Sequence, residues 1–265
     1  MTWAEERRRL GAREGNDWQV TAQQVDMSRA ARPVRLLAFN ALPQSVMIDA
    51  AKSALIIIDM QNDFCAADGW LAHIGVDITP ARTPIEPLAR LLPELRRHGV
   101  AVIWLNWGNR PDRANLPPAL LHVYNPDGRS VGLGDRLPGR ADGARVLEKG
   151  SPSAAIVDGL VAADTDLHVD KYRMSGFWDA ELDSILRNRG ITMVLFAGVN
   201  ADQCVLATLI DANCLGYDTL MLEDCSATTS PAFCWDATVY NVRQCFGFTA
   251  QSGDLIAALR ALESQ

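Results

Sequence analysis

The sequence predicts an α/β fold: a single-domain, three-layer α/β/α arrangement around a central, mostly parallel sheet, preceded by an N-terminal arm. Residues 54–58 form a continuous apolar, β-branched run, which is typical of a central parallel strand. Further short apolar runs alternate with helical patterns of about 10 to 15 residues, as in βαβ units. A chain of 265 residues is long enough to bury a sizeable core.

The first 50 residues differ from the rest. They contain an arginine run at residues 7–9 and the stretch Arg-Pro-Val-Arg at 32–35, with no sustained period. We interpret residues 1–50 as an arm that packs on the domain or on a neighbouring subunit; a loosely ordered tail is the alternative. The domain itself would then occupy residues 51–265.

The elements of the first half follow from periodicity and from stop signals. After the strand at 54–58, residues 85–98 carry leucines at helical spacing, and Gly99 ends that helix. The next strand is 101–105. Residues 107–150 are rich in Gly, Pro, Asp and Arg, and an irregular segment of this length inside a compact domain is usually functional.

The second half continues the alternation. We expect a short helix at 153–161, a short strand at 166–169, and a helix at 179–188 that Asp179 caps and Gly190 ends. The remaining expected elements are strand 192–197, helix 202–215, strand 219–222, helix 232–245, strand 247–250 and helix 253–262.

Composition excludes several classes of protein. Apolar residues make up 48% and charged residues 22% of the chain, which is ordinary for a soluble enzyme. The net charge of −7 argues against generic binding to nucleic acid or to anionic membranes. No apolar run approaches the roughly 18 residues of a membrane span, and the N-terminus has no apolar signal core. We therefore expect a cytoplasmic protein without a nucleic-acid or membrane partner.

The spacing of the cysteines and histidines indicates neither a set of disulfides nor a metal site. None of the six cysteines lies in a Cys-x-x-Cys pair, and the four histidines lack metal-ligand spacing. We expect most of the cysteines to be buried, small apolar residues rather than disulfide partners.

Three polar side chains lie where predicted elements meet. Asp59 directly follows the strand at 54–58, Lys171 follows the strand at 166–169, and Cys204 opens a helix after a sharp turn. Ligands bind at the carboxyl ends of strands in open α/β sheets, so these residues form a candidate active site. A helix N-terminus stabilises negative charge, and we therefore expect a lowered pKa for the Cys204 thiol.

Each of these residues also has a purely structural explanation. Asp59 could cap the following turn together with Asn62 and Asp63, Lys171 could be a solvated surface charge, and Cys204 could be a buried structural cysteine. Taken together, the three segments favour the functional interpretation.

The segments resemble the isochorismatase-like cysteine hydrolase superfamily. The resemblance lies in Ile-Ile-Ile-Asp-Met-Gln-Asn-Asp-Phe at 56–64, in the Lys171 segment and in Gly-Val-x-x-x-x-Cys-Val-x-x-Thr at 198–208, and it covers roughly residues 50 to 250 in the right order. Within the superfamily, residues 173–178 and 182–187 look closest to the ureidoacrylate amidohydrolase branch.

The resemblance implies a catalytic triad of Asp59, Lys171 and Cys204. It also implies a cis peptide bond after Val199 and an oxyanion hole formed by the backbone N–H groups of Asn200 and Cys204. Relatives often have Thr or a small residue at position 200. Because the backbone N–H is the working group, we expect the hole to survive with Asn. The family is commonly oligomeric, so we also expect a homo-oligomer.

The chemistry of such a triad predicts a hydrolase. Asp59 would accept the thiol proton, Lys171 would stabilise the charged pair, and Cys204 would attack a carbonyl carbon. The expected reaction is cleavage of a C–N bond in a small amide, carbamoyl or ureido compound through a thioester. Vinyl ether hydrolysis of the isochorismatase type is an alternative, although it needs no thiol. A catalytically silent interaction protein is another, which loss of a triad member would mark.

The substrate pocket is harder to predict. The aromatic weighting of the predicted loops suggests a flat or partly apolar acyl group. The nicotinamidase branch binds metal through an Asp-x-His pair and further histidines, but only His73 is near the first motif here. We therefore predict no metal and no other cofactor. The candidate substrate-binding residues are Asn62, Phe64, Trp70, Asn106, Trp107, Tyr172, Phe177 and Trp178.

Overall fold

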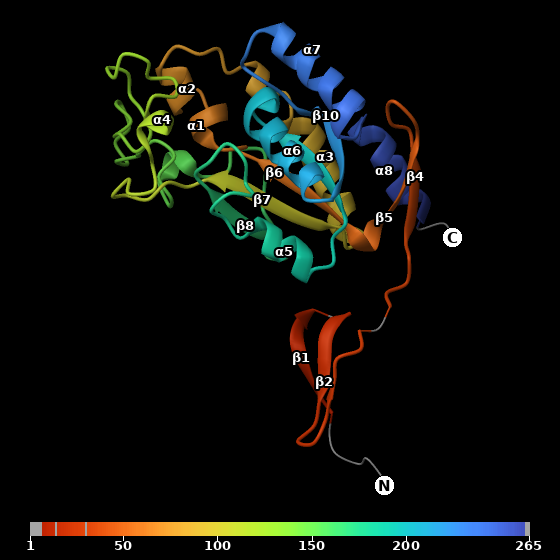
Figure 1. The fold of residues 1–265 in the computed structure, drawn as a ribbon. Helices are drawn as coiled ribbons and strands as arrows, with labels where there is room; N and C mark the ends of the chain where they lie inside the picture. Colours follow the sequence, from red (N-terminus) through yellow and green to blue (C-terminus); the bar gives the residue numbers. More distant parts are fainter. Residues whose placement is uncertain (1–6, 14, 30, 263–265) are drawn as a thin grey trace.

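The computed structural model describes residues 7–13, 15–29 and 31–262. A six-stranded sheet with the order β11-β10-β9-β6-β7-β8 forms its centre, and every pairing within this sheet is parallel (Figure 1). The predicted fold class is confirmed. The strands are β6 (Ser53–Ile58), β7 (Ala101–Trp107), β8 (Leu167–Lys171), β9 (Met193–Gly198), β10 (Asp218–Ser226) and β11 (Phe248–Ala250).

Helices flank the sheet (Figure 1). The helices α3 and α8 pack on each other, and both contact β10. Short π-helical turns at Ala201–Val205 and Val242–Phe246 adjoin α6 and α7. The helices of the described chain are α1 (Asn62–Cys65), α2 (Trp70–His73), α3 (Ile85–Arg97), α4 (Pro118–Leu121), α5 (Leu182–Asn188), α6 (Leu206–Cys214), α7 (Ala232–Asn241) and α8 (Ser252–Ala261).

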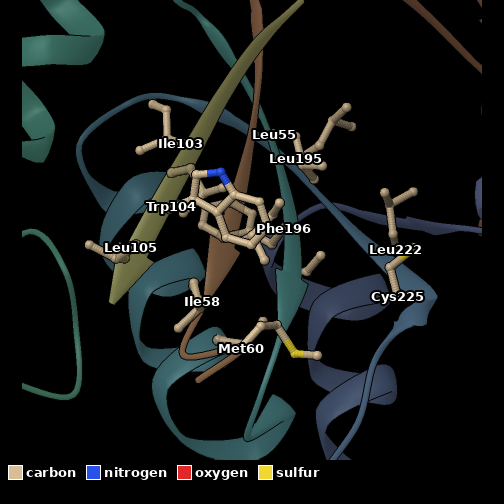
Figure 2. Packing of buried hydrophobic residues seen from close by; sticks show 14 of the residues in the cluster. Leu55, Ile58, Met60, Ile103, Trp104, Leu105, Leu195, Phe196, Leu222 and Cys225 are labelled. Carbon is tan, nitrogen blue, oxygen red and sulfur yellow. The ribbon is translucent and has the colours of Figure 1, made fainter. Parts of the chain in front are cut away.

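The central strands are apolar on both faces because both faces are covered. Ile56 lies in register with Ile103 and Phe196, while the next residue, Ile57, lies in register with Trp104. Successive side chains point to opposite faces of a sheet, so these two sets fill two separate layers of the core. All of these residues are buried, and Figure 2 shows members of both sets around the central strands.

Two expected helices are wrong in whole or in part. The segment 153–161 forms only a 3-10 turn at Pro152–Ala154, because the chain then pairs with the loop after β6, where the Val157 N–H donates to the Met60 carbonyl at 2.9 Å. The helix expected from 179 begins only at Leu182, as α5. Asp179 does not cap it: its φ is 57°, and its carboxylate pairs with Arg173 at 2.9 Å.

The first 50 residues contain strands that showed no clear sequence period. A hairpin of β4 (Leu36–Phe39) and β5 (Val46–Asp49) lies along α8, with Leu37 and Phe39 buried in the core. A second antiparallel sheet projects from the domain in Figure 1 and contacts it through Asn16, whose Nδ2 donates to the Asn188 carbonyl at 2.6 Å. This sheet consists of β1 (Arg8–Arg13), β2 (Asn16–Val20) and β3 (Val25–Asp26). Within the described residues, no helix has both the length and the apolar character that a membrane crossing requires.

Candidate active site

Asp59 and Lys171 form one buried ion pair at the carboxyl end of the sheet. The Lys171 ammonium lies 2.8 Å from Asp59 Oδ2, and both side chains are 0% exposed. Asp59 follows β6 with a left-handed backbone (φ 53°), and its N–H donates to the Leu105 carbonyl at 3.0 Å. Lys171 ends β8 and reaches Asp59 past Trp107 of the intervening strand, with its ammonium 4.4 Å from the indole centroid.

Cys204 completes this group of three. It lies in the π-helical turn Ala201–Val205, is 5% exposed, and its thiol lies within hydrogen-bonding reach of Asp59 and Lys171. Met174 approaches from the segment after β8, with its sulfur 3.8 Å from Cys204 Sγ. The structure therefore brings the acid, the lysine and the thiol together, although they come from three separate parts of the sequence.

The expected low pKa of the Cys204 thiol is wrong for the free protein. Burial raises the pKa of Cys204 to about 12, and the lowering by the Lys171 charge does not overcome it. Burial also raises the pKa of Asp59, against the opposing effect of Lys171. Burial by itself would lower the pKa of Lys171, but the charges of Asp59 and Cys204 raise it. The thiol therefore keeps its proton at neutral pH until an acceptor removes it.

The turn between Asn200 and Cys204 is tightly held. The peptide bond between Val199 and Asn200 is cis, as the resemblance implied. The N–H groups of Gln203 and Val205 both donate to the Asn200 carbonyl, at 3.0 and 3.2 Å. The Asn200 side chain also anchors the turn, since its Oδ1 accepts from the Thr229 N–H at 3.0 Å. The backbone that carries the two expected oxyanion donors is thus fixed from within and from the segment that follows β10.

The candidate pocket residues fall into two groups. Trp107 borders the ion pair, and Asn106 precedes it at the end of β7. Phe64 and Trp70 are buried on α1 and α2, with ring centroids 6.4 Å apart. Asn62 donates to the Pro152 carbonyl at 3.2 Å. These residues all lie at or after the carboxyl ends of β6 and β7.

The others make contacts elsewhere in the fold. The Tyr172 ring lies under the Arg173 guanidinium at 5.1 Å. Phe177 packs on Tyr217 at 5.9 Å between ring centroids, and Trp178 is 63% exposed, with its indole N–H bound to Asp211 of α6 at 2.7 Å. A role of these three in substrate binding stays a prediction.

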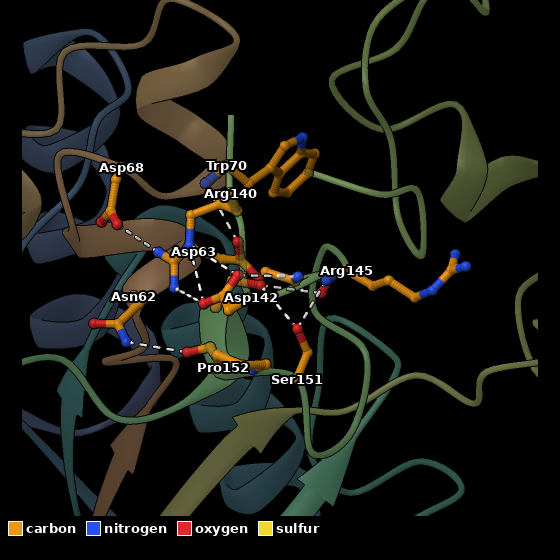
Figure 3. Close-up of polar contacts among 11 residues, drawn as sticks. Asn62, Asp63, Asp68, Trp70, Arg140, Asp142, Arg145, Ser151 and Pro152 are labelled. Carbon is orange, nitrogen blue, oxygen red and sulfur yellow. Dashed lines mark hydrogen bonds and ion pairs between the residues drawn. The ribbon is translucent and has the colours of Figure 1, made fainter. Parts of the chain in front are cut away.

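Asp63 is a site residue that sequence reasoning passed over except as a turn partner. Its carboxylate is fully buried and accepts from the Leu147 N–H at 2.7 Å and from the Trp70 N–H at 3.3 Å. Burial raises the pKa of Asp63 to about 6. Figure 3 shows how it joins α1 to the 140–151 segment, where Arg140 bridges Asp68 and Asp142. The one feature of the sequence that could have marked Asp63 is its position four residues after Asp59.

Gln61, two positions after Asp59, also joins separate segments of the chain. Its Nε2 donates to the carbonyls of Trp107 and Ala154, at 2.9 and 2.6 Å, and its Oε1 accepts from the Trp107 N–H at 2.8 Å. Gln61 therefore joins the ends of β6 and β7 to the loop before β8. In the described ranges 7–13, 15–29 and 31–262, no three His, Cys, Asp or Glu side chains are grouped so that they could hold a metal ion.

Comparison with known proteins finds curated relatives over most of the chain. A ureidoacrylate amidohydrolase, RutB, from Rhizobium rhizogenes is 33% identical over 221 residues, which cover 83% of this chain and 88% of that protein. RutB from Klebsiella pneumoniae is 30% identical over 226 residues, which cover 84% of this chain and 94% of that protein.

Solved structures share the fold. A cysteine hydrolase from Pseudomonas syringae superposes with a TM-score of 0.68 at 22% identity, covering 88% of this chain and all of that one. An N-carbamoylsarcosine amidase from Thermoplasma acidophilum superposes with a TM-score of 0.57 at 27% identity, covering 76% of this chain and 96% of that one. The sequence model of the Isochorismatase domain matches residues 53–254. The chain therefore belongs to the isochorismatase domain family.

Proposed function

We propose that this protein is a cysteine-dependent amidohydrolase that cleaves a C–N bond of a small amide, carbamoyl or ureido compound through a thioester. The observation that carries the proposal is the buried Asp59–Lys171 pair within reach of the Cys204 thiol. The names of the relatives support amide hydrolysis in general, since they are ureidoacrylate amidohydrolases and an N-carbamoylsarcosine amidase.

The first half of the reaction forms the thioester. Asp59 takes the thiol proton as the Cys204 sulfur attacks the carbonyl carbon, because a thiol with a pKa of about 12 is not ionised beforehand. Lys171 stabilises the negative charge that this transfer leaves on sulfur. The oxyanion of the tetrahedral intermediate accepts from the N–H groups of Asn200 and Cys204, each donor worth roughly 10²–10³ in rate.

Collapse of the intermediate breaks the C–N bond. The protonated Asp59 gives its proton to the departing nitrogen, which leaves as ammonia or an amine. A water molecule then attacks the thioester carbonyl while Asp59 takes one of its protons. That proton returns to the Cys204 sulfur when the C–S bond breaks, so the acid is released and the free enzyme is restored.

A release assay for ammonia or amine tests the proposal, with a panel of ureido acids, carbamoyl compounds and primary amides. Cys204→Ala should abolish turnover, whereas Cys214→Ala, at an exposed cysteine on the following helix, should not. Dialysis against a strong chelator should leave the rate unchanged, since the first motif lacks an Asp-x-His pair. Near-native turnover by Cys204→Ala would show that the nucleophile is wrongly assigned.

A further inference from the structure

Tyr124 joins the long irregular segment to the turn that carries the nucleophile. Its hydroxyl accepts from Gln203 Nε2 at 2.9 Å and lies 3.1 Å from Gln203 Oε1. Asn200 Nδ2 approaches the same hydroxyl at 3.5 Å. Gln203 precedes Cys204, so one phenol oxygen touches the side chains of a residue at each end of the turn. Neither periodicity nor a motif marks Tyr124 in the sequence.

The ring of Tyr124 is held on its other side. It meets the Trp70 ring edge-to-face, with 5.7 Å between centroids, and the Trp70 indole N–H donates to the Val131 carbonyl at 2.7 Å. Tyr124 also has a left-handed backbone, with φ 55°, which a bulky residue rarely adopts. Such a backbone conformation persists where the surrounding contacts hold it. In Tyr124 these contacts are the Trp70 ring and the Gln203 side chain, which both bind the phenol.

The turn has two lateral supports, and they come from different sources. After β10, the Thr229 N–H donates to Asn200 Oδ1 at 3.0 Å, and Ser230 Oγ lies 3.3 Å from Gln203 Nε2. Tyr124 supplies the second support, from the long irregular segment. Gln203 is therefore held between Ser230 and Tyr124, and its main chain runs directly into Cys204.

We propose that Tyr124 is a positioning residue that holds the Asn200–Cys204 turn in the geometry of the oxyanion hole. The inference rests on the proposed amidohydrolase function. Donors aimed in advance at the oxyanion stabilise the transition state more than the bound substrate. The phenol acts on the turn that carries the oxyanion donors, and these donors act mainly in the transition state. Its loss therefore lowers kcat and leaves KM nearly unchanged.

Tyr124→Phe is the direct test, because it keeps the ring on Trp70 and removes only the hydroxyl. A lost hydrogen bond of ordinary strength predicts a fall in kcat of roughly 3- to 10-fold. The rate at which iodoacetamide alkylates Cys204 should not change, since displacement at its CH₂ group creates no oxyanion. Tyr217→Phe is the matched control: it removes a hydroxyl that binds Asp183 of α5 at 2.8 Å, and its kcat should match the wild type.

A double-mutant cycle with Gln203→Leu tests the route of the effect. If the hydroxyl acts through Gln203, the double variant is no slower than the slower single variant. Unchanged kcat in Tyr124→Phe, strictly additive losses in the cycle, or alkylation that falls in parallel with kcat would each overturn the assignment. A wild-type protein that is inactive on the whole amide panel would instead overturn the proposed function itself, and the positioning role with it.

Discussion

The Lys171 ammonium lies 2.8 Å from the Asp59 carboxylate, although the two residues come from strands that are not neighbours in the sheet. Lys171 ends β8 at the edge of the sheet, Asp59 follows β6, and β7 lies between them. The lysine crosses over Trp107, at the end of β7, and its charge faces the indole ring. Both charges are removed from water, so each depends on the other for its charged state.

Asp59→Asn should lower kcat at least 10²-fold, because an amide cannot accept the thiol proton. It should also destabilise the fold by about 3–5 kcal/mol, since the Lys171 charge stays buried without its partner. Steady-state kinetics and urea unfolding measure the two effects. Asp170→Asn, next to Lys171 in the sequence, is the control. Because Asp170 forms a partly exposed ion pair with Lys149, its loss should change the stability by about 0–1 kcal/mol. A loss of activity below tenfold in Asp59→Asn would rule out Asp59 as the base.

Lys171→Met should raise the pKa of the Cys204 thiol further, because the ammonium is the charge that lowers it. Well below the pKa, each unit of increase reduces the thiolate population, and hence alkylation, about tenfold. Alkylation of the Cys204 peptide by iodoacetamide, followed by mass spectrometry from pH 7 to 10, should be slower at every pH. Lys149→Met, at an exposed lysine, is the control. An unchanged profile in Lys171→Met would remove the lysine from the mechanism.

Asp63 should make stability depend on pH with an unusual sign for a carboxylate. Its pKa in the folded protein, about 6, is above the ordinary value of 3.8 for this carboxyl group. Its contribution is therefore fully present below pH 3.8 and is lost as pH rises through 6, by about 3 kcal/mol in total. The free energy of unfolding of the wild type, minus that of Asp63→Asn, should fall between pH 4 and 7.

Urea unfolding at several pH values measures this difference. Other titrating groups cancel because both proteins carry them. Asp158→Asn, at an exposed position, is the control. A difference between wild type and Asp63→Asn that stays constant from pH 4 to 7 would contradict the prediction.

We also predict that the protein is a homo-oligomer and that the arm contributes to its assembly. Leu10 on β1, Val25 on β3 and Met27 directly after β3 are exposed, and large exposed apolar side chains on a small sheet favour an interaction surface. Deleting residues 1–28 removes β1–β3 but keeps the hairpin whose Leu37 is buried, so the domain should stay folded while the mass measured by light scattering falls.

A full-length variant with Leu10→Ser and Met27→Ser is the matched test, because it keeps the strands and changes only their exposed side chains. It should dissociate as the deletion does. An unchanged oligomer in both variants would show that the arm belongs to its own subunit, to which Asn16 is bound through Asn188. A monomeric full-length protein would end the proposal altogether.

The sheet and the triad could be predicted because their signals are local. The apolar run before Asp59 and the turn before Cys204 are visible within a few residues. Tyr124 could not be predicted, since its partner Gln203 lies 79 positions away and the segment around it has no period. The helix expected at 153–161 failed for a related reason: Val157 bonds to the distant Met60 backbone, which outweighs the local helical preference.

Two of the anchors near the triad, Asp63 and Gln61, bind main-chain groups. Asp63 accepts from the N–H of Leu147, and Gln61 donates to the carbonyl of Ala154. Every residue has a carbonyl, and every residue except proline has an N–H. The amino acids at 147 and 154 can therefore change without loss of these bonds. The loop sequence is therefore free to change over evolution, or by redesign in the laboratory, while Asp63 and Gln61 keep the same bonds around the buried ion pair.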